Sequence, residues 1–281
     1  LDTLTTPREP VCGIEMQRPS IMGILNATPD SFSDGGQHFT LSDAVKGAVA
    51  MIAEGADMLD IGGESTRPGA DFVEATEEAR RTGPVIESLR AAGVDTPISI
   101  DTRKALVART AFEAGANLFN DVTALSFDAD SLTTAAELGA NVCIMHAAGD
   151  PKTMQDRPEY DDVLLDVYDY LEARIAVCEA AGIPRNKIMI DPGIGFGKTQ
   201  THNLALFRGI AVFHSLGCPI LLGASRKRFI GTIGHAPEAA DRVAGSIAVG
   251  LQALNQGVQM LRVHDIAETR QAIALWSALL D

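Results

Sequence analysis

One short phrase recurs along this chain and constrains its fold more than any other feature. Glycine, alanine and an aspartate or asparagine are followed by apolar residues, and looser copies come later in the chain. The copies stand at 55–60, 115–120, 139–143, 217–222 and 257–262. A helix that ends on a left-handed glycine, followed by a short loop and a buried strand, gives this pattern. The phrase therefore predicts repeated units of helix and strand.

Counting these units gives eight strands, each short and apolar, as strands covered on both faces should be. The expected strands are 20–25, 57–62, 97–100, 117–120, 141–145, 187–190, 219–223 and 259–263. The expected helices are 41–54, 73–92, 103–114, 129–138, 160–181, 201–215, 239–256 and 265–280. Eight such units predict an α/β fold, a (β/α)8 TIM barrel in a single domain over residues 19–281. An open doubly wound sheet is the alternative, and residues 1–18 are expected to form an extension with a turn or hairpin.

Composition excludes several functions before any motif is considered. The 281 residues carry 23 Lys and Arg against 37 Asp and Glu, a formal charge of −14. A nucleic-acid binder needs a basic face, so we expect no nucleic-acid partner. The chain has no run of 18 apolar residues and no charged leader followed by an apolar stretch, so we expect neither a membrane span nor secretion. Four scattered cysteines without a CxxC pair predict reduced thiols and a cytoplasmic protein: Cys12, Cys143, Cys178 and Cys218.

Polar residues follow every expected strand, at the end where barrels of this class hold their active sites. The segments are 26–36, 60–69, 101–104, 120–121, 145–146, 191–198, 223–228 and 262–265. A single Asp in such a place is more often a helix cap than a ligand, but capping does not require Arg, Lys or His. Eight polar strand ends together therefore predict one active site at the mouth of the barrel.

Two of these segments indicate how an acidic protein could bind an anion. The glycine-rich one is not a phosphate loop, because three residues separate Gly193 from Gly197 where that motif needs four. We expect instead a tight loop whose backbone passes close to a ligand. Arg262 and His264 alternate at the end of the last strand, so their side chains point the same way. Together with the basic turn 226–228, they lie where this fold usually binds phosphate, which predicts an anion site.

Four motifs resemble those of dihydropteroate synthases, and the resemblance keeps their order from about Ser20 to the end of the chain. They are NATPDSFSDGG at 26–36, GGESTRPG at 62–69, DPGIGFG at 191–197 and SRK at 225–227. The resemblance implies a (β/α)8 barrel and a transferase of folate biosynthesis with Mg²⁺ as cofactor. Such an enzyme joins 6-hydroxymethyl-7,8-dihydropterin pyrophosphate to 4-aminobenzoate and yields 7,8-dihydropteroate and pyrophosphate. Enzymes of this family are usually homodimers and are targets of sulfonamides.

The resemblance also implies roles for particular residues. At the pterin edge inside the barrel we expect Asp101, Asn120, Asp191 and Lys227, with Met145 and Phe196 near the flat ring. At the pyrophosphate we expect Asn26, Arg262, His264 and Thr66, and Asn26 and Asp34 would share Mg²⁺. Over aminobenzoate we expect Phe32, Arg67 and Pro68, with Arg228 where some relatives carry serine. The residues expected to act in catalysis are Asn26, Asp101, Lys227, Arg262 and His264.

These groups predict a largely dissociative displacement without a covalent enzyme intermediate. The cations stabilise the leaving pyrophosphate, while Asp101 and Asp191 place negative charge beside the pterin methylene. The aminobenzoate amine is nucleophilic while neutral and needs no strong base. Two alternatives stay open. One is a pterin-binding methyltransferase domain, which has no use for a pyrophosphate site, and the other is a catalytically silent barrel paralogue.

Overall fold

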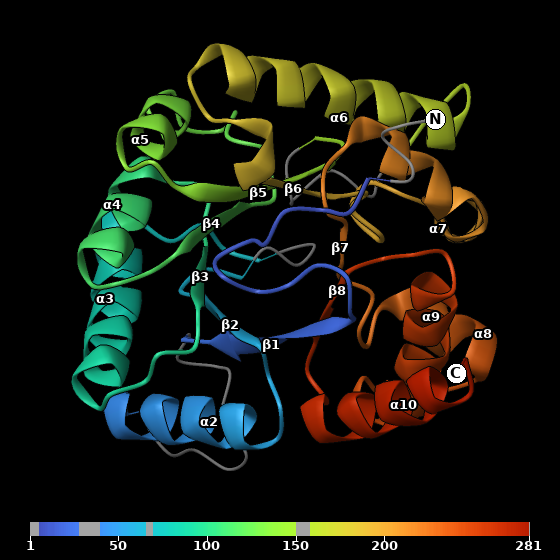
Figure 1. Ribbon diagram of the computed structural model, residues 1–281, viewed down its shortest axis with the longest axis horizontal. Coiled ribbons are helices and arrows are strands. Elements are labelled where there is room, and N and C mark those ends of the chain that lie inside the picture. The colour runs from blue at the N-terminus through green and yellow to red at the C-terminus, as the bar shows by residue number, and fades with distance from the viewer. Residues whose placement is uncertain (1–5, 28–39, 66–69, 150–157, 281) are drawn as a thin grey trace.

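The computed structural model describes residues 6–27, 40–65, 70–149 and 158–280, which form a ring of parallel strands surrounded by helices (Figure 1). The strands are β1 Ser20–Asn26, β2 Met58–Gly62, β3 Ile98–Asp101, β4 Leu118–Asp121, β5 Asn141–Met145, β6 Ile188–Asp191, β7 Leu221–Leu222 and β8 Met260–Val263. Backbone hydrogen bonds join them in the order β6-β5-β4-β3-β2-β1-β8-β7. A single parallel bridge between Ile190 and Ile220 closes the ring. This closure confirms the predicted barrel and excludes the open doubly wound sheet.

The helices lie outside the ring, and each expected helix is present. They are α2 Leu41–Ala53, α3 Ala75–Ala91, α4 Ala105–Glu113, α5 Ser131–Glu137, α6 Val163–Ala180, α7 Gln200–Gly209, α8 Arg228–Gly234, α9 Val243–Leu254 and α10 Ile266–Ala278, with short 3-10 turns η1 Arg185–Lys187, η2 Ile210–Leu216 and η3 Ala240–Arg242. The expected helix 201–215 divides into α7 and η2, and 239–256 divides into η3 and α9. Helix α8 was not expected from the sequence, because its two glycines weaken the helical pattern. No helix in the described ranges is long and apolar enough to cross a bilayer.

The recurring phrase ends a helix and begins a strand at each of its copies. All five of its glycines have positive φ, between 58° and 110°. The Asp or Asn that follows hydrogen-bonds the neighbouring strand in two copies: Asp57 Oδ2 accepts from Ile21 N at 2.8 Å, and Asn117 Oδ1 accepts from Ile98 N at 2.9 Å. The phrase therefore sets the register between adjacent strands as well as the turn itself.

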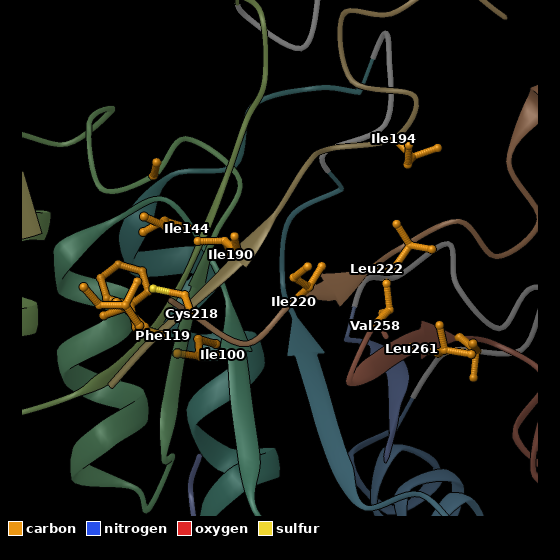
Figure 2. Packing of buried hydrophobic residues seen from close by; sticks show 14 of the residues in the cluster. Ile100, Phe119, Ile144, Ile190, Ile194, Cys218, Ile220, Leu222, Val258 and Leu261 are labelled. Atoms are coloured by element: carbon orange, nitrogen blue, oxygen red, sulfur yellow. The ribbon is translucent and has the colours of Figure 1, made fainter. Parts of the chain in front are cut away.

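Side chains alternate along each strand, and two separate apolar cores result. The larger core lies between the strands and the helices and includes Ile100, Phe119, Ile144, Ile190 and Leu222 (Figure 2). The smaller core is formed by the opposite faces of the strands, inside the barrel. Its strand residues are Met22, Met58, Leu118, Cys143, Met189, Leu221 and Met260.

The N-terminal segment packs against this smaller core. Val11 and Ile14 form an antiparallel bridge with N···O distances of 3.1 and 2.9 Å, so the expected hairpin is present. Both side chains are buried in the smaller core together with Met16. In Figure 1 the dark blue segment crosses the middle of the ring. Apolar side chains thus fill the end of the barrel near the strand N-termini. The four cysteines are free thiols, as expected.

Candidate active site

The next inward-facing layer of the barrel is polar. Met58, Leu118, Met189 and Met260 belong to the apolar core, and two residues further along the same strands stand Asp60, Asn120, Asp191 and Arg262. We call the polar set around this layer the mouth cluster: Asp60, Asp101, Asn120, Asp191, Lys227 and Arg262. The interior therefore changes from apolar to charged within two residues, at the carboxyl ends of the strands.

Arg262 joins two carboxylates across the barrel. Its Nε donates to Asp60 Oδ2 and its Nη2 donates to Asp101 Oδ2, both at 2.6 Å. Asn120 Nδ2 contacts the two Asp60 oxygens at 3.3 and 3.4 Å. The structure thus brings an expected pyrophosphate residue next to two expected pterin residues. Asp60, which is fully buried, was not among the expected site residues. Its signal was an acidic residue inside an otherwise apolar strand.

The buried carboxyl group of Asp101 can accept a further hydrogen bond from a ligand. Burial raises the pKa of its carboxyl to about 7, although Arg262 opposes the rise. Its Oδ1 atom is buried and has no hydrogen-bond partner within the described part of the chain. An unsatisfied buried acceptor costs about 1–3 kcal/mol, which a ligand N–H group would relieve. Burial likewise raises the pKa of Asp191.

Asp191 and Lys227 form the other side of the mouth cluster. Asp191 Oδ1 accepts from Gly193 N at 2.7 Å, which fixes the start of the loop after β6. Lys227 Nζ donates to Ile194 O and lies 4.5 Å from the centroid of the Phe196 ring. Burial lowers the pKa of Lys227 to about 8, and Asp191 opposes this. Two expected pterin residues and an expected ring-packing residue therefore come together.

The glycine-rich loop after β6 packs on the turn after β5. A Cβ atom at Gly193 would lie 1.8 Å from His146 O, and one at Gly197 would lie 2.6 Å from Ala148 Cβ. These two glycines therefore let the loop after β6 pack closely against the protein's own chain at His146 and Ala148. Lys198 stabilises this packing, because its buried Nζ atom lies 2.9 Å from His146 Nδ1. Burial lowers the pKa of Lys198 to about 7.

The turns after β7 and β8 carry the expected anion-binding groups. Ser225 Oγ lies 3.0 Å from His264 Nδ1. Arg226, counted above in the basic turn, is paired with Asp265, with 3.0 Å between Nε and Oδ2. Asp265 therefore balances the charge of Arg226 within the protein. Arg228 is exposed at the first position of α8.

Two more expected residues can be placed, and the rest cannot. Asn26 is half-buried at the end of β1, and Met145 is buried at the end of β5. Five expected residues lie outside the described residues: Phe32, Asp34, Thr66, Arg67 and Pro68.

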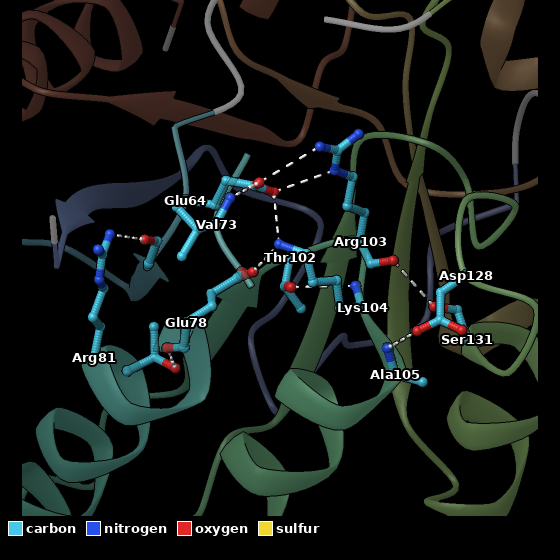
Figure 3. Close-up of polar contacts among 12 residues, drawn as sticks. Glu64, Val73, Glu78, Arg81, Thr102, Arg103, Lys104, Ala105, Asp128 and Ser131 are labelled. Carbon is cyan, nitrogen blue, oxygen red and sulfur yellow. Dashed lines mark hydrogen bonds and ion pairs between the residues drawn. The ribbon is translucent and has the colours of Figure 1, made fainter. Parts of the chain in front are cut away.

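A second group of buried charges, which was not expected from the sequence, lies beside the ends of β2 and β3. We call Glu64, Glu78, Arg103 and Lys104 the outer cluster (Figure 3). Lys104 Nζ lies 3.0 Å from Glu64 Oε2 and 2.5 Å from Glu78 Oε2, and Arg103 Nε lies 3.2 Å from Glu64 Oε2. Glu64 Oε1 also accepts from Val73 N at 2.9 Å. The four charged side chains balance one another within the protein.

The sequence is similar to those of known proteins along nearly the whole chain. A family model described as "Pterin binding enzyme" matches residues 22–264. The dihydropteroate synthase of Escherichia coli is 46% identical over 267 residues, which cover 95% of this chain and 94% of that protein. This chain belongs to the dihydropteroate synthase family. The Haemophilus influenzae member is 44% identical, with 94% of this chain and 95% of that protein covered.

Solved dihydropteroate synthase structures have the same fold. The Xanthomonas albilineans enzyme with 4-aminobenzoic acid has a TM-score of 0.91 and 46% identity, covering 98% of this chain and 99% of that one. The same enzyme in complex with 7,8-dihydropteroate has a TM-score of 0.86 and 43% identity, covering 95% of each chain. A Yersinia pestis synthase in a sulfonamide complex has a TM-score of 0.90 and 44% identity, covering 95% of this chain and 96% of that one.

Proposed function

We propose that this chain condenses 6-hydroxymethyl-7,8-dihydropterin pyrophosphate with 4-aminobenzoate to give 7,8-dihydropteroate and pyrophosphate. The observation that carries the proposal is the mouth cluster, in which buried acids and half-buried cations line a barrel whose other end is filled by apolar side chains. The named relatives are synthases, which argues against the methyltransferase alternative. The retained acids and cations argue against a silent paralogue.

The pterin binds in the mouth cluster. Its ring edge offers amide-like N–H groups and an amine, and Asp101 and Asp191 supply buried acceptors for them. Asn120 accepts and donates beside them, and Lys227 donates to the ring carbonyl. Met145 and Phe196 pack near the ring faces.

The pyrophosphate lies toward the outside of the mouth, on Asn26, Arg262, His264 and Thr66. Asn26 and Asp34 would hold Mg²⁺, a hard ion that prefers a few protein oxygens together with phosphate and water. The donor set fits this ion. Asn26 presents a carboxamide at a half-buried strand end, and the described residues contain no cluster of three metal-ligating side chains such as zinc would require. Bound there, Mg²⁺ would neutralise charge on the leaving group.

The protein groups act by stabilising charge on both sides of a breaking C–O bond. Arg262 and His264 donate to the departing pyrophosphate oxygens. Asp101 and Asp191 place negative charge beside the methylene carbon as it becomes cationic. The lone pair of the aminobenzoate nitrogen then forms the C–N bond, and the extra proton on that nitrogen passes to solvent. No general base and no covalent enzyme intermediate are needed.

Aminobenzoate binds last, beneath Phe32, Arg67 and Pro68, with Arg228 near its carboxylate. These residues stand in Gly- and Pro-punctuated segments, 26–36 and 64–69, of the kind that move and carry function. We expect sulfonamides, which copy aminobenzoate, to bind the loaded enzyme only. Titrating a sulfonamide into the enzyme with and without Mg²⁺, pterin and pyrophosphate checks this, and equal affinity in both would contradict ordered binding.

Pyrophosphate release tests the function itself. With Mg²⁺ and the pterin pyrophosphate, we expect release to require 4-aminobenzoate and to match the dihydropteroate formed. Pyrophosphate release that does not depend on 4-aminobenzoate would overturn the proposed condensation. Excess chelator should abolish turnover, and Asn26→Ala should weaken it without lowering the Tm. Turnover that persists in chelator would contradict the metal role.

We further propose a cytoplasmic homodimer whose catalytic barrel begins at residue 19, after an extension of residues 1–18. Free thiols support the location. Exposed apolar side chains on and beyond α10, among them Leu275 and Leu279, support a partner surface. Sedimentation of the purified chain tests the dimer.

A further inference from the structure

One buried lysine in the loop after β6 has no part in the proposed reaction. The Lys198 side chain is 3% exposed, and the residue stands two positions before α7. Its Nζ lies 2.9 Å from His146 Nδ1 and donates to two carbonyl oxygens, His146 O at 3.3 Å and Phe196 O at 3.0 Å. Burial and the neighbouring lysine lower the pKa of His146 to about 3, so its ring is neutral at pH 7. No carboxylate in the described part of the chain forms an ion pair with Lys198.

The two carbonyl groups connect Lys198 to two neighbouring strand ends. His146 directly follows β5, and its N–H donates at 3.1 Å to the carbonyl of Asp191, the last residue of β6. The Phe196 N–H donates to Gly193 O at 3.1 Å, within the loop after β6. Lys198 therefore satisfies the other backbone polar group of Phe196 and ties it to the turn after β5. Because both NH₃⁺ and NH₂ carry at least two N–H donors, this link does not depend on the charge of the amine.

The backbone of Phe196 determines where its aromatic ring lies. The ring is half-buried, and Lys227 Nζ lies 4.5 Å from its centroid. With its N–H and carbonyl both fixed, the residue can move its ring only by rotation about the side-chain bonds. Without Lys198 the carbonyl would lose its partner, and this part of the loop could shift together with the ring. The next carbonyl, Gly197 O, accepts from Tyr160 Oη at 2.7 Å, so the rest of the loop stays anchored.

We propose that Lys198 is a positioning residue for the pterin: its amine fixes the carbonyl of Phe196 to the turn after β5 and so holds the Phe196 ring beside Lys227, where the pterin ring packs. This inference rests on the proposed pterin site. Lys198 acts through the loop and does not touch the ligand.

The position of the ring can be measured without a ligand. An aromatic ring shifts the proton resonances of groups beside it, so NMR spectra of the lysine-labelled protein report the Phe196 ring through Lys227. Phe196→Ala gives the Lys227 resonance without the ring, and we expect Lys198→Met to move the resonance toward that value. Lys187→Met is the matched control, because it also removes a contact between a lysine and a backbone carbonyl, with Gly139 O at 2.7 Å. It should leave the Lys227 resonance unchanged.

Calorimetry with 6-hydroxymethylpterin tests the consequence for binding. We expect Lys198→Met to lower the pterin affinity about threefold to tenfold, the value of one hydrogen bond, and to leave the affinity for inorganic pyrophosphate unchanged. Because Lys198 acts through the ring, the same change should have no further effect on pterin affinity in a Phe196→Ala background. Lys198→Arg keeps donors for both carbonyls and should bind the pterin nearly as tightly as the wild type.

Three results would overturn the inference: an unchanged Lys227 resonance in Lys198→Met, an unchanged pterin affinity in that variant, or losses that add in the double variant with Phe196→Ala. Lys198→Gln, whose amide ends one bond short of the lysine amine, serves if Lys198→Met does not fold, and the same direction of change is expected in both measurements. Failure of the wild type to bind the pterin would instead contradict the proposed function, and the resonance measurement would still decide whether Lys198 places the ring.

Discussion

The mouth cluster and the outer cluster are both groups of charges with buried carboxylates, yet their charges are balanced differently. The outer cluster sets two carboxylates against two cations, in contacts of 2.5–3.2 Å. The mouth cluster sets three carboxylates against two cations, and one of its acceptor atoms has no partner in the described ranges. Glu78 Oε1 in the outer cluster is likewise buried without a hydrogen-bond partner among the described residues, so the two groups differ in their balance of charges and not in having an unsatisfied acceptor.

The pKa shifts differ within the outer cluster, because burial raises the pKa of Glu78, as it does that of Asp101, whereas the pKa of Glu64 is lowered. Burial alone would raise the pKa of Glu64, but the hydrogen bond from Val73 and those from Arg103 and Lys104 bring it below the ordinary value. Burial raises the pKa of Asp101 to about 7 even though Arg262 stands beside it. A carboxylate that the protein leaves incompletely compensated can gain from a ligand. Because the outer cluster has as many cations as carboxylates and the mouth cluster has one carboxylate more than cations, we infer that the outer cluster serves the fold and the mouth cluster serves binding.

Removing one charge from the outer cluster should have the largest effect on stability. Lys104→Met leaves Glu64 and Glu78 buried side by side without their shared cation. We expect the free energy of unfolding in urea to fall by about 3–5 kcal/mol, as when one partner of a buried pair is removed. Glu78→Gln added to Lys104→Met should recover part of the loss. A loss too small to measure in the single variant would show that the cluster contributes nothing to folding.

Changing a mouth carboxylate should affect binding before stability. Asp191→Asn keeps an oxygen for the Gly193 N–H but places an NH₂ donor where the pterin needs an acceptor. We expect pterin affinity to fall by about 1–3 kcal/mol, measured by calorimetry, with little change in the urea midpoint. Unchanged affinity would remove Asp191 from the site.

The pH dependence of stability should differ by one proton between wild type and Asp101→Asn. With a folded pKa near 7 and an unfolded value near 4, Asp101 holds in the folded state a proton that the unfolded chain has lost. Its contribution to the free energy of unfolding therefore falls as pH rises from about 4 to 7, by at most about 1.4 kcal/mol per pH unit. Asp101→Asn should flatten that slope, and identical slopes would contradict the raised pKa.

The sequence was enough to predict the barrel fold and most residues of the mouth cluster. The recurring phrase marks where helices end, so it gives the strand count, and the alternation of Arg262 and His264 places both on one side of a strand. The same alternation applied to Met58 and Asp60 would have found the missed acid. It was read instead as one more polar strand end.

Other features depend on contacts that only the closed barrel creates. Lys104 meets Glu78 because α3 packs beside the end of β3, and neither residue has a sequence pattern that distinguishes it from a surface charge. Arg226 pairs with Asp265 because β7 and β8 are adjacent. Such partners are 26 and 39 residues apart in the chain, beyond the reach of local patterns.

Proton release on pterin binding tests the incomplete charge balance of the mouth cluster most directly. Calorimetry of 6-hydroxymethyl-7,8-dihydropterin at pH 7, in two buffers of different ionisation enthalpy, gives the number of protons released per ligand bound. Because ring N–H groups would stabilise the charged form of Asp101, we predict that the wild type releases part of a proton and that Asp101→Asn does not. Binding without proton release in the wild type, or equal release in both proteins, would contradict this account.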